Sequence, residues 1–219
     1  MYDDGMVTHL AVIPDGNRRW ARARGLQARD GHAAGIHQIG VIARAAFDAG
    51  VETFTFWWGS PANLSRRDPK EVADIIDVLN AWLCTEGVKL VQELDCRFYA
   101  LGKWEAHAEG IRSGVERCQA AQGAGRRQIC LLMAYDGREE ILDAAQGGVE
   151  GFEERLWTAV LPPVDLVLRS GGEPQLSAGF LLWQIAHAQL AFSDSFWPDV
   201  TPEELRRILH VRPERRFGA

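Results

Sequence analysis

Short apolar runs alternate with longer amphipathic stretches along most of the 219-residue chain. The apolar runs predict strands, and several are continuously apolar, as is typical of strands covered on both faces. The stretches between them space their apolar residues as helices do. The predicted strands are 9–13, 53–58, 97–101, 128–134, 165–169 and 190–193, and the predicted helices are a short one ending near residue 24, then 32–49, 69–94, 104–121, 138–146, 152–160 and 202–209.

This alternation predicts an α/β fold with a mostly parallel six-stranded sheet flanked by helices on both sides. No internal repeat or low-complexity linker divides the chain, so we expect a single domain over residues 1–219. In such sheets ligands gather at the carboxyl ends of the strands. Three polar loops, 15–20, 59–67 and 169–173, follow predicted strands. We expect them to meet at one edge of the sheet.

The first of these loops carries the most chemistry. Its sequence is Asp15-Gly16-Asn17-Arg18-Arg19-Trp20, and it lies between the end of a predicted strand and the start of a predicted helix. A helix N-terminus favours anions, and arginine binds phosphate well, so the loop is a candidate diphosphate cradle. Asp15 is suited to hold a Mg²⁺ shared with the phosphates. An ordinary Asp-Gly turn before a solvated basic helix start explains the same residues, and the segment alone leaves both interpretations open.

Composition narrows the class of ligand and the compartment. The 24 Lys and Arg against 30 Asp and Glu give a net charge of −6, which argues against a nucleic-acid partner. Basic clusters at 18–29, 66–67 and 215–216 suit a small anion instead. The four cysteines are widely spaced without a Cys-x-x-Cys, which favours free thiols in a reducing compartment. Neither a leader nor an apolar run of membrane-spanning length is present, so we expect a cytoplasmic protein without a membrane span.

Two blocks of sequence carry a family resemblance. The first is HLAVIPDGNRRW at 9–20, followed by Gly-His-Ala-Ala-Gly at 31–35. The second joins PVDLVLRSGGE at 163–173, FLLWQ at 180–184, FWPD at 196–199 and the terminal Glu-Arg-Arg-Phe-Gly at 214–218. Together they closely resemble the cis-prenyltransferases of the undecaprenyl diphosphate synthase type. The resemblance implies a homodimeric, Mg²⁺-dependent enzyme that transfers an allylic prenyl group between isoprenyl diphosphates, with a hydrophobic tunnel beside two diphosphate subsites.

The resemblance also implies roles for single residues. Asp15 would ligate Mg²⁺, His32 would lie close to the donor diphosphate, and Asn63 falls where the family places a residue implicated in proton removal. The partner subunit's tail would reach the acceptor site. The implied substrate-binding residues are Gly16, Asn17, Arg18, Arg19, Trp20, Arg29, Ser60, Pro61, Ala62, Arg66, Arg169, Gln175, Ser177, Arg216 and Gly218.

Several of these positions have a plain structural interpretation. His32 is equally explained as a helix residue bonded to backbone, and Trp57 and Trp58 as sheet core. The pairs 66–67 and 215–216 are also explained as solvated surface.

The departures from the family pattern concern mainly the acceptor half. Gln175 stands where the family has an Arg, and Gln189 stands where a Glu completes the metal site, although an amide oxygen also coordinates Mg²⁺. The run 59–64 reads Gly-Ser-Pro-Ala-Asn-Leu and lacks the usual Glu and Trp. This arrangement resembles the irregular lavandulyl and cyclolavandulyl diphosphate synthases, which join an allylic donor, dimethylallyl or geranyl, head-to-middle onto dimethylallyl diphosphate. Trp58, in place of a small residue, predicts a short tunnel and a product of about two or three isoprene units.

Two other functions stay open from the sequence. One is regular cis-chain elongation with isopentenyl diphosphate, and the other is a noncatalytic scaffold subunit. A scaffold has no need of a metal carboxylate, so Asp15 together with the intact donor residues argues against it.

Overall fold

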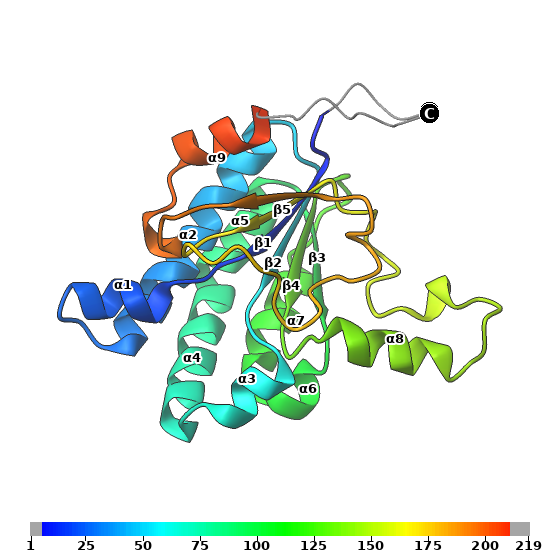
Figure 1. Cartoon of the computed structure of the whole chain (residues 1–219), viewed down its shortest axis with the longest axis horizontal. Coiled ribbons are helices and arrows are strands. Elements are labelled where there is room, and N and C mark those ends of the chain that lie inside the picture. The colour runs from blue at the N-terminus through cyan, green and yellow to red at the C-terminus, as the bar shows by residue number, and fades with distance from the viewer. Residues whose placement is uncertain (1–5, 211–219) are drawn as a thin grey trace.

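The computed structural model of the chain describes residues 6–210 and contains one six-stranded sheet. The strand order is β3-β4-β2-β1-β5-β6, and each neighbouring pair is parallel, which confirms the predicted α/β fold (Figure 1). The strands are β1 His9–Ile13, β2 Thr53–Trp57, β3 Arg97–Leu101, β4 Gln128–Leu132, β5 Leu166–Arg169 and β6 Gln189–Phe192.

Helices connect the strands, mostly where the pattern predicts them. They are α1 Asn17–Ala23, α2 Ala28–Asp48, α3 Pro61–Arg66, α4 Pro69–Trp82, α5 Val88–Glu93, α6 Trp104–His107, α7 Arg112–Ala120, α8 Gly137–Ala145 and α9 Pro202–His210. The predicted helix 69–94 consists of α4 and α5 joined by a π-helical turn, Leu83–Gly87. The predicted helix 104–121 breaks after α6, and a 3₁₀ turn, Glu109–Ile111, leads into α7.

Two local predictions are wrong. The segment 59–67 is not all loop, because Ser60 caps the short helix α3 and Pro61 takes its first position. The segment 152–160 is not an α-helix and contains only the 3₁₀ turn Glu153–Arg155. There the backbone N–H and hydroxyl of Thr158 both donate to the buried carboxylate of Glu140, so a tertiary contact takes the N–H that a helix would use.

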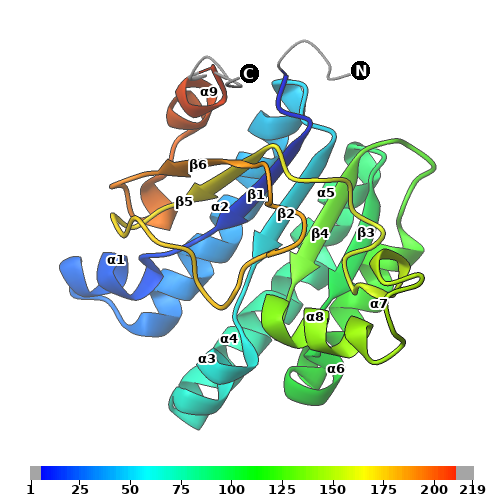
Figure 2. The same cartoon turned by 45° about the vertical axis from the view of Figure 1, so that its right-hand side comes forward.

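The two faces of the sheet are covered differently. Helices α2, α4, α5, α7 and α9 pack on one face, where the larger apolar cluster lies. The other face is covered mainly by non-helical segments around Leu161–Val164 and Phe180–Leu181, and α8 flanks them (Figure 2). The predicted sheet flanked by helices is thus confirmed, but the second layer is built largely from turns.

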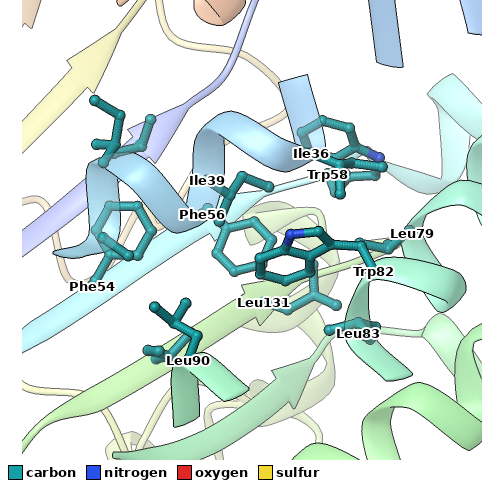
Figure 3. Close-up of a cluster of buried hydrophobic side chains, with 14 of the residues drawn as sticks. Ile36, Ile39, Phe54, Phe56, Trp58, Leu79, Trp82, Leu83, Leu90 and Leu131 are labelled. Carbon is teal, nitrogen blue, oxygen red and sulfur yellow. The ribbon is translucent and has the colours of Figure 1, made fainter. Parts of the chain in front are cut away.

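Aromatic side chains fill the larger cluster. Phe54, Phe56, Trp58 and Trp82 lie together between the sheet and α2 and α4 (Figure 3). The indole of Trp82 lies against Gly40 and Gly87, where a Cβ would come within 3.6 Å and 3.3 Å of it. The contact at Gly40 would be an ordinary one, whereas a Cβ on Gly87 would crowd the indole by a few tenths of an ångström.

Over residues 6–210, no helix has the length and apolar character needed to cross a membrane. The cysteines at positions 84, 96, 118 and 130 are free thiols, and all but Cys84 are buried.

Candidate active site

A cavity of about 560 Å³ opens at the carboxyl ends of β1, β2 and β5. It lies where the sequence predicts that three polar loops meet, and each loop contributes to its wall. The residues that line it are Ile13, Pro14, Asp15, Gly16, Asn17, Arg18, Arg19, Arg22, Leu26, Ala28, His32, Trp57, Trp58, Gly59, Asn63, Arg67, Arg169, Glu173 and Ser177.

The turn after β1 is fixed by its backbone. Gly16 has φ 101°, a left-handed conformation, and a Cβ there would lie 2.7 Å from the Phe196 ring. Only glycine fits this position without strain. No side chain caps α1, so its first backbone N–H groups remain available toward the cavity.

Asp15 is held by its backbone as well as by its carboxylate. The buried hydroxyl of Ser170 accepts from the Asp15 N–H at 3.0 Å and donates to the Asp15 carbonyl at 2.8 Å. The carboxylate accepts from Arg169 at 2.8 Å and lies 3.4 Å from Arg19. About a third of the Asp15 side chain is exposed. A carboxylate therefore faces the cavity between two guanidinium groups.

Arg169 forms the floor of this arrangement. Its guanidinium is buried and donates to Asp15, to Glu173 at 3.2 Å and to the carbonyl of Gln175 at 2.6 Å. Within the described part of the chain its Nε has no hydrogen-bond partner. A buried guanidinium binds anions strongly, because water does not screen its charge.

His32 is buried beside the tryptophan of the β2 end. Its Nε2 lies 3.4 Å from the carboxylate of Glu71, and its ring meets Trp58 edge-on. Burial, with the nearby positive charges of Arg67 and Arg18, lowers the pKa of His32 to about 4, although Glu71 opposes the shift. His32 is therefore neutral at physiological pH. Among residues 6–210 its Nδ1 has no partner, so it can accept or donate one further hydrogen bond in the cavity.

Asn63, the third residue of α3, is hydrogen-bonded to Ser60, which caps that helix. Its amide oxygen accepts from the Ser60 N–H at 3.3 Å, while its own N–H donates to the Ser60 hydroxyl at 3.1 Å. The oxygen is thus partly used, and the amide NH₂ is the group left for the cavity. A proton-removing role for Asn63 stays a prediction.

The structure brings together nine of the residues implicated from the sequence. They are Asp15, Gly16, Asn17, Arg18, Arg19, His32, Asn63, Arg169 and Ser177. Trp20 does not line the cavity, because its indole N–H donates to Asp199 and Arg24 stacks on its ring. Arg29 pairs instead with Asp74 at 2.9 Å. Ser60, Pro61, Ala62, Arg66 and Gln175 also lie outside the lining, and Arg216 and Gly218 fall outside the described residues.

The structure places Gln189 away from Asp15 of the same chain, and its metal role stays a prediction. Gln189 begins β6 and pairs with Leu166 at the amino end of β5. The cavity lies at the other end, beside Arg169, three residues farther along the strand. That separation is about 10 Å at the usual rise per residue, so Gln189 cannot share a cation with Asp15 of the same chain.

Sequence analysis assigned no individual role to four charged residues of this region, Arg22, Arg67, Glu71 and Glu173, and Arg22 is among those that line the cavity. Arg67, not Arg66, lines the cavity: Arg66 is the exposed last residue of α3, and Arg67 follows it in extended conformation. Burial lowers the pKa of the Arg67 guanidinium, but arginine stays charged. Glu173 lines the cavity, and Glu71 contacts Arg18 and His32 from outside it. The only sequence signal for Glu173 was its place in the Arg-Ser-Gly-Gly-Glu block, and nothing local marked Glu71.

Known proteins are similar to this chain over nearly its whole length. Curated isoprenyl transferases match along nearly the whole chain: that of Porphyromonas gingivalis is 33% identical over 96% of this chain and 89% of its own length. Isoprenyl transferase 1 of Bradyrhizobium diazoefficiens is 36% identical with the same coverage. A crystal structure of lavandulyl diphosphate synthase from Lavandula x intermedia, in complex with dimethylallyl diphosphate, superposes with a TM-score of 0.86 at 27% identity, covering 94% of this chain and 95% of that one.

The family model described as "Putative undecaprenyl diphosphate synthase" matches residues 13–218. That span includes the cavity, the two arginines and the carboxylate between them. The chain is therefore a prenyltransferase that belongs to the cis-prenyltransferase, or undecaprenyl diphosphate synthase, family.

Proposed function

We propose that this chain is a short-chain prenyl diphosphate synthase of the irregular type. It transfers a dimethylallyl or geranyl group head-to-middle onto dimethylallyl diphosphate and gives a branched, lavandulyl-type isoprenyl diphosphate. The observation that carries the proposal is the acceptor half of the cavity. Arg169 lines this half, while Gln175, which stands where the family has an arginine, is neutral, exposed and outside the lining.

The likeness to lavandulyl diphosphate synthase supports this proposal. That protein shares the fold at a TM-score of 0.86 and was crystallised with dimethylallyl diphosphate. The two C5 diphosphates, isopentenyl and dimethylallyl, differ in the position of the double bond. A change in the charges of the acceptor subsite would therefore be expected to change which of these two diphosphates is bound as the acceptor.

The reaction follows from ionisation of the donor. The allylic C–O bond breaks, and the bonding electrons leave with the diphosphate. The double bond of the acceptor attacks the allylic cation through its internal carbon, a new C–C bond forms, and loss of one proton restores neutrality. Arg18, Arg19 and Arg67 line the cavity and would stabilise the charge of the departing diphosphate, and the indoles of Trp57 and Trp58, which also line it, would shield the cation from water.

The cavity suits a Mg²⁺ that arrives with the diphosphate. Residues 6–210 contain no cluster of three or more His, Cys, Asp or Glu able to hold a metal alone. Mg²⁺ commonly uses one or two carboxylates together with substrate phosphates, and Asp15 offers such a carboxylate. When bound, the ion would neutralise charge on the leaving diphosphate.

Apolar side chains beyond the cavity support a short product. Trp58 lines the cavity and belongs to the aromatic cluster between the sheet and α2 and α4, with Trp82 in the same cluster (Figure 3). Both indoles are less than a tenth exposed. A longer prenyl chain would have to displace them.

We also expect a homodimer, as the family resemblance implies. The exposed apolar side chains include Leu142 of α8, Val149, Trp183 and, on the edge strand β6, Leu190 and Phe192. An edge strand with exposed apolar residues is a natural pairing surface. Light scattering coupled to size-exclusion chromatography tests this expectation, and a monomer at micromolar concentration would contradict it.

Regular chain elongation is the second candidate, since the curated relatives are isoprenyl transferases. One assay separates the candidates. The purified chain is incubated with Mg²⁺ and either dimethylallyl diphosphate alone or dimethylallyl plus isopentenyl diphosphate, and the products are identified by mass spectrometry after dephosphorylation.

Branched C10 product from dimethylallyl diphosphate alone is the expected result. Linear product that requires isopentenyl diphosphate would overturn head-to-middle coupling in favour of elongation. If no product forms in either mixture or with geranyl diphosphate as donor, the scaffold interpretation is favoured.

A further inference from the structure

Residues 193–197, between β6 and α9, are hydrogen-bonded to the loop that follows β5 (Figure 1). The Ser193 carbonyl accepts from the Gly172 N–H at 2.9 Å. The Ser195 carbonyl accepts from the Gly171 N–H at 2.8 Å. Both glycines have positive φ, 74° for Gly172 and 89° for Gly171, so these two bonds fix a backbone that glycine adopts readily in several forms. We call residues 193–197 the bridging segment.

The bridging segment also holds the turn after β1. The Trp197 N–H donates to the Asp15 carbonyl at 2.9 Å. The Phe196 ring fills the place where Gly16 lacks a Cβ, and the guanidinium carbon of Arg19 lies 5.4 Å from the centre of that ring. One short stretch of chain therefore sets the distance between the turn after β1 and the loop after β5, which are the two halves of the cavity.

Glu204, in the first turn of α9, fastens the bridging segment to that helix. One carboxylate oxygen accepts from the hydroxyl of Ser193, and the other accepts from the hydroxyl of Ser195 at 3.0 Å. The buried Ser193 hydroxyl also accepts from the Ser195 N–H at 3.1 Å. Helix α9 in turn packs on α2. Both oxygens of one side chain thus hold the two residues whose carbonyls bind the loop after β5.

Prenyl transfer joins two bound molecules, so its rate depends on how the two halves of the cavity are aligned. Each half has its own cation, Arg19 on α1 and Arg169 at the end of β5, and each can still bind a diphosphate if the bridging segment loosens. A displacement of about 1 Å between reacting groups can cost about 10²-fold in rate. Loosening the segment should therefore lower kcat much more than it raises KM.

We infer that Glu204 is a positioning residue for prenyl transfer, which acts through Ser193 and Ser195 to keep the two halves of the cavity at a fixed separation. The inference rests on the proposed function only in that the chain transfers prenyl groups. Kinetics are therefore measured with the acceptor that the wild type uses. A wild type that requires isopentenyl diphosphate would refute head-to-middle coupling, and the same variants would still test this inference with that acceptor.

Steady-state kinetics of two Glu204 variants provide the test. Glu204→Ala removes both acceptor oxygens, whereas in Glu204→Gln the amide oxygen accepts from one serine hydroxyl and the NH₂ donates to the other. Glu203→Ala is the matched control, because Glu203 lies in the same helical turn and pairs with Arg206 at the surface. Backbone hydrogen exchange of residues 170–173 reports on the N–H groups that the bridging segment binds. Thermal unfolding checks that each variant is folded, and Ser195→Ala replaces Glu204→Ala if it is not.

Glu204→Ala is expected to lower kcat about ten- to a hundredfold, while KM for either diphosphate changes less than about threefold. Its residues 170–173 should exchange faster than in the wild type. Glu204→Gln should keep most of the kcat, and Glu203→Ala should match the wild type in both measurements.

A triple variant tests whether Glu204 acts through the two serines. Adding Glu204→Ala to a chain that already carries Ser193→Ala and Ser195→Ala should lower kcat no further, because the contact is already lost. Wild-type kcat in Glu204→Ala, a loss seen in KM alone, unchanged exchange of residues 170–173 or an additive loss in the triple variant would each overturn the inference.

Discussion

Replacing Trp58 by alanine should lengthen the product by one isoprene unit. The indole is 6% exposed, lines the cavity and packs in the aromatic cluster on the α2–α4 face of the sheet. Its removal opens space next to the cavity, and an opening of about 150 Å³ in an apolar core already accepts benzene. An isoprene unit has one carbon fewer than benzene, so the vacated volume is large enough for it.

The substitution carries a stability cost that must be separated from the effect on product length. Truncating a buried tryptophan costs about 3–5 kcal/mol, because the transfer free energy is lost and a cavity remains. Trp58→Phe leaves a smaller void and should cost less. Trp157→Ala is the control, since Trp157 packs on the opposite face of the sheet and does not line the cavity. It should lower the free energy of unfolding without changing the product.

The assay is mass spectrometry of dephosphorylated products from the donor and acceptor that the wild type uses. The free energy of unfolding of each variant is measured by urea titration. A folded, active Trp58→Ala enzyme that still makes only the wild-type product would refute the reasoning that this indole limits length. A longer product from Trp157→Ala would refute it as well, because the effect would then follow from lost stability alone.

Four further outcomes are expected. Asp15→Ala should reduce turnover by about 10²–10³-fold or more while the thermal unfolding curve stays cooperative, and full activity would show that the carboxylate has no part in catalysis. Ser170→Ala should reduce kcat and lower the free energy of unfolding by about 1–3 kcal/mol, because it removes both hydrogen bonds to the backbone of Asp15, and Ser170→Thr should restore kcat by keeping the hydroxyl. Gly35→Ala should destabilise the fold and weaken pyrophosphate binding, since the new Cβ would lie 2.1 Å from the Asn17 amide oxygen; Asn17→Gly in the same chain should recover much of the stability. Burial lowers the pKa of His9 from 6.5 to about 4. The stability that the neutral, buried ring contributes is therefore complete above pH 6.5, and the free energy of unfolding falls by about 3 kcal/mol between pH 6.5 and 4. Urea titrations should give a smaller dependence of this free energy on pH for His9→Gln than for the wild type, and an identical dependence would contradict the assignment.

Much of the fold could be read from local pattern. The apolar runs placed all six strands. The signal was clearest for β1, β2 and β5, which are buried along their whole length and are therefore continuously apolar. The helices that pack on the face with the larger apolar cluster were predicted from the amphipathic spacing of their residues. Where prediction failed, a tertiary contact replaced a local one: buried Glu140 takes the N–H and hydroxyl of Thr158, so the segment 152–160 does not form its helix.

The candidate site was predicted unevenly for a related reason. Residues at or just after the carboxyl end of a strand, such as Arg169 and Asp15, could be assigned to the cavity from the rule for parallel sheets. Residues on helices could not, because a one-residue difference in helical phase decides between cavity and solvent. Trp20 and Arg19 on α1 differ in this way. Arg66 and Arg67 differ because α3 ends at Arg66 and Arg67 continues in extended conformation.

The sequence by itself determined the strand–helix order, the family and the group of polar loops that carry the chemistry. Only the tertiary structure decided which side chains share space and which charges meet. It separated Gln189 from Asp15 through the register of β5 and β6, and it brought Glu173 against Arg19 and Arg169. The physical reason is that periodicity fixes which face of an element is buried, whereas distances between residues far apart in the chain are set by strand register and packing.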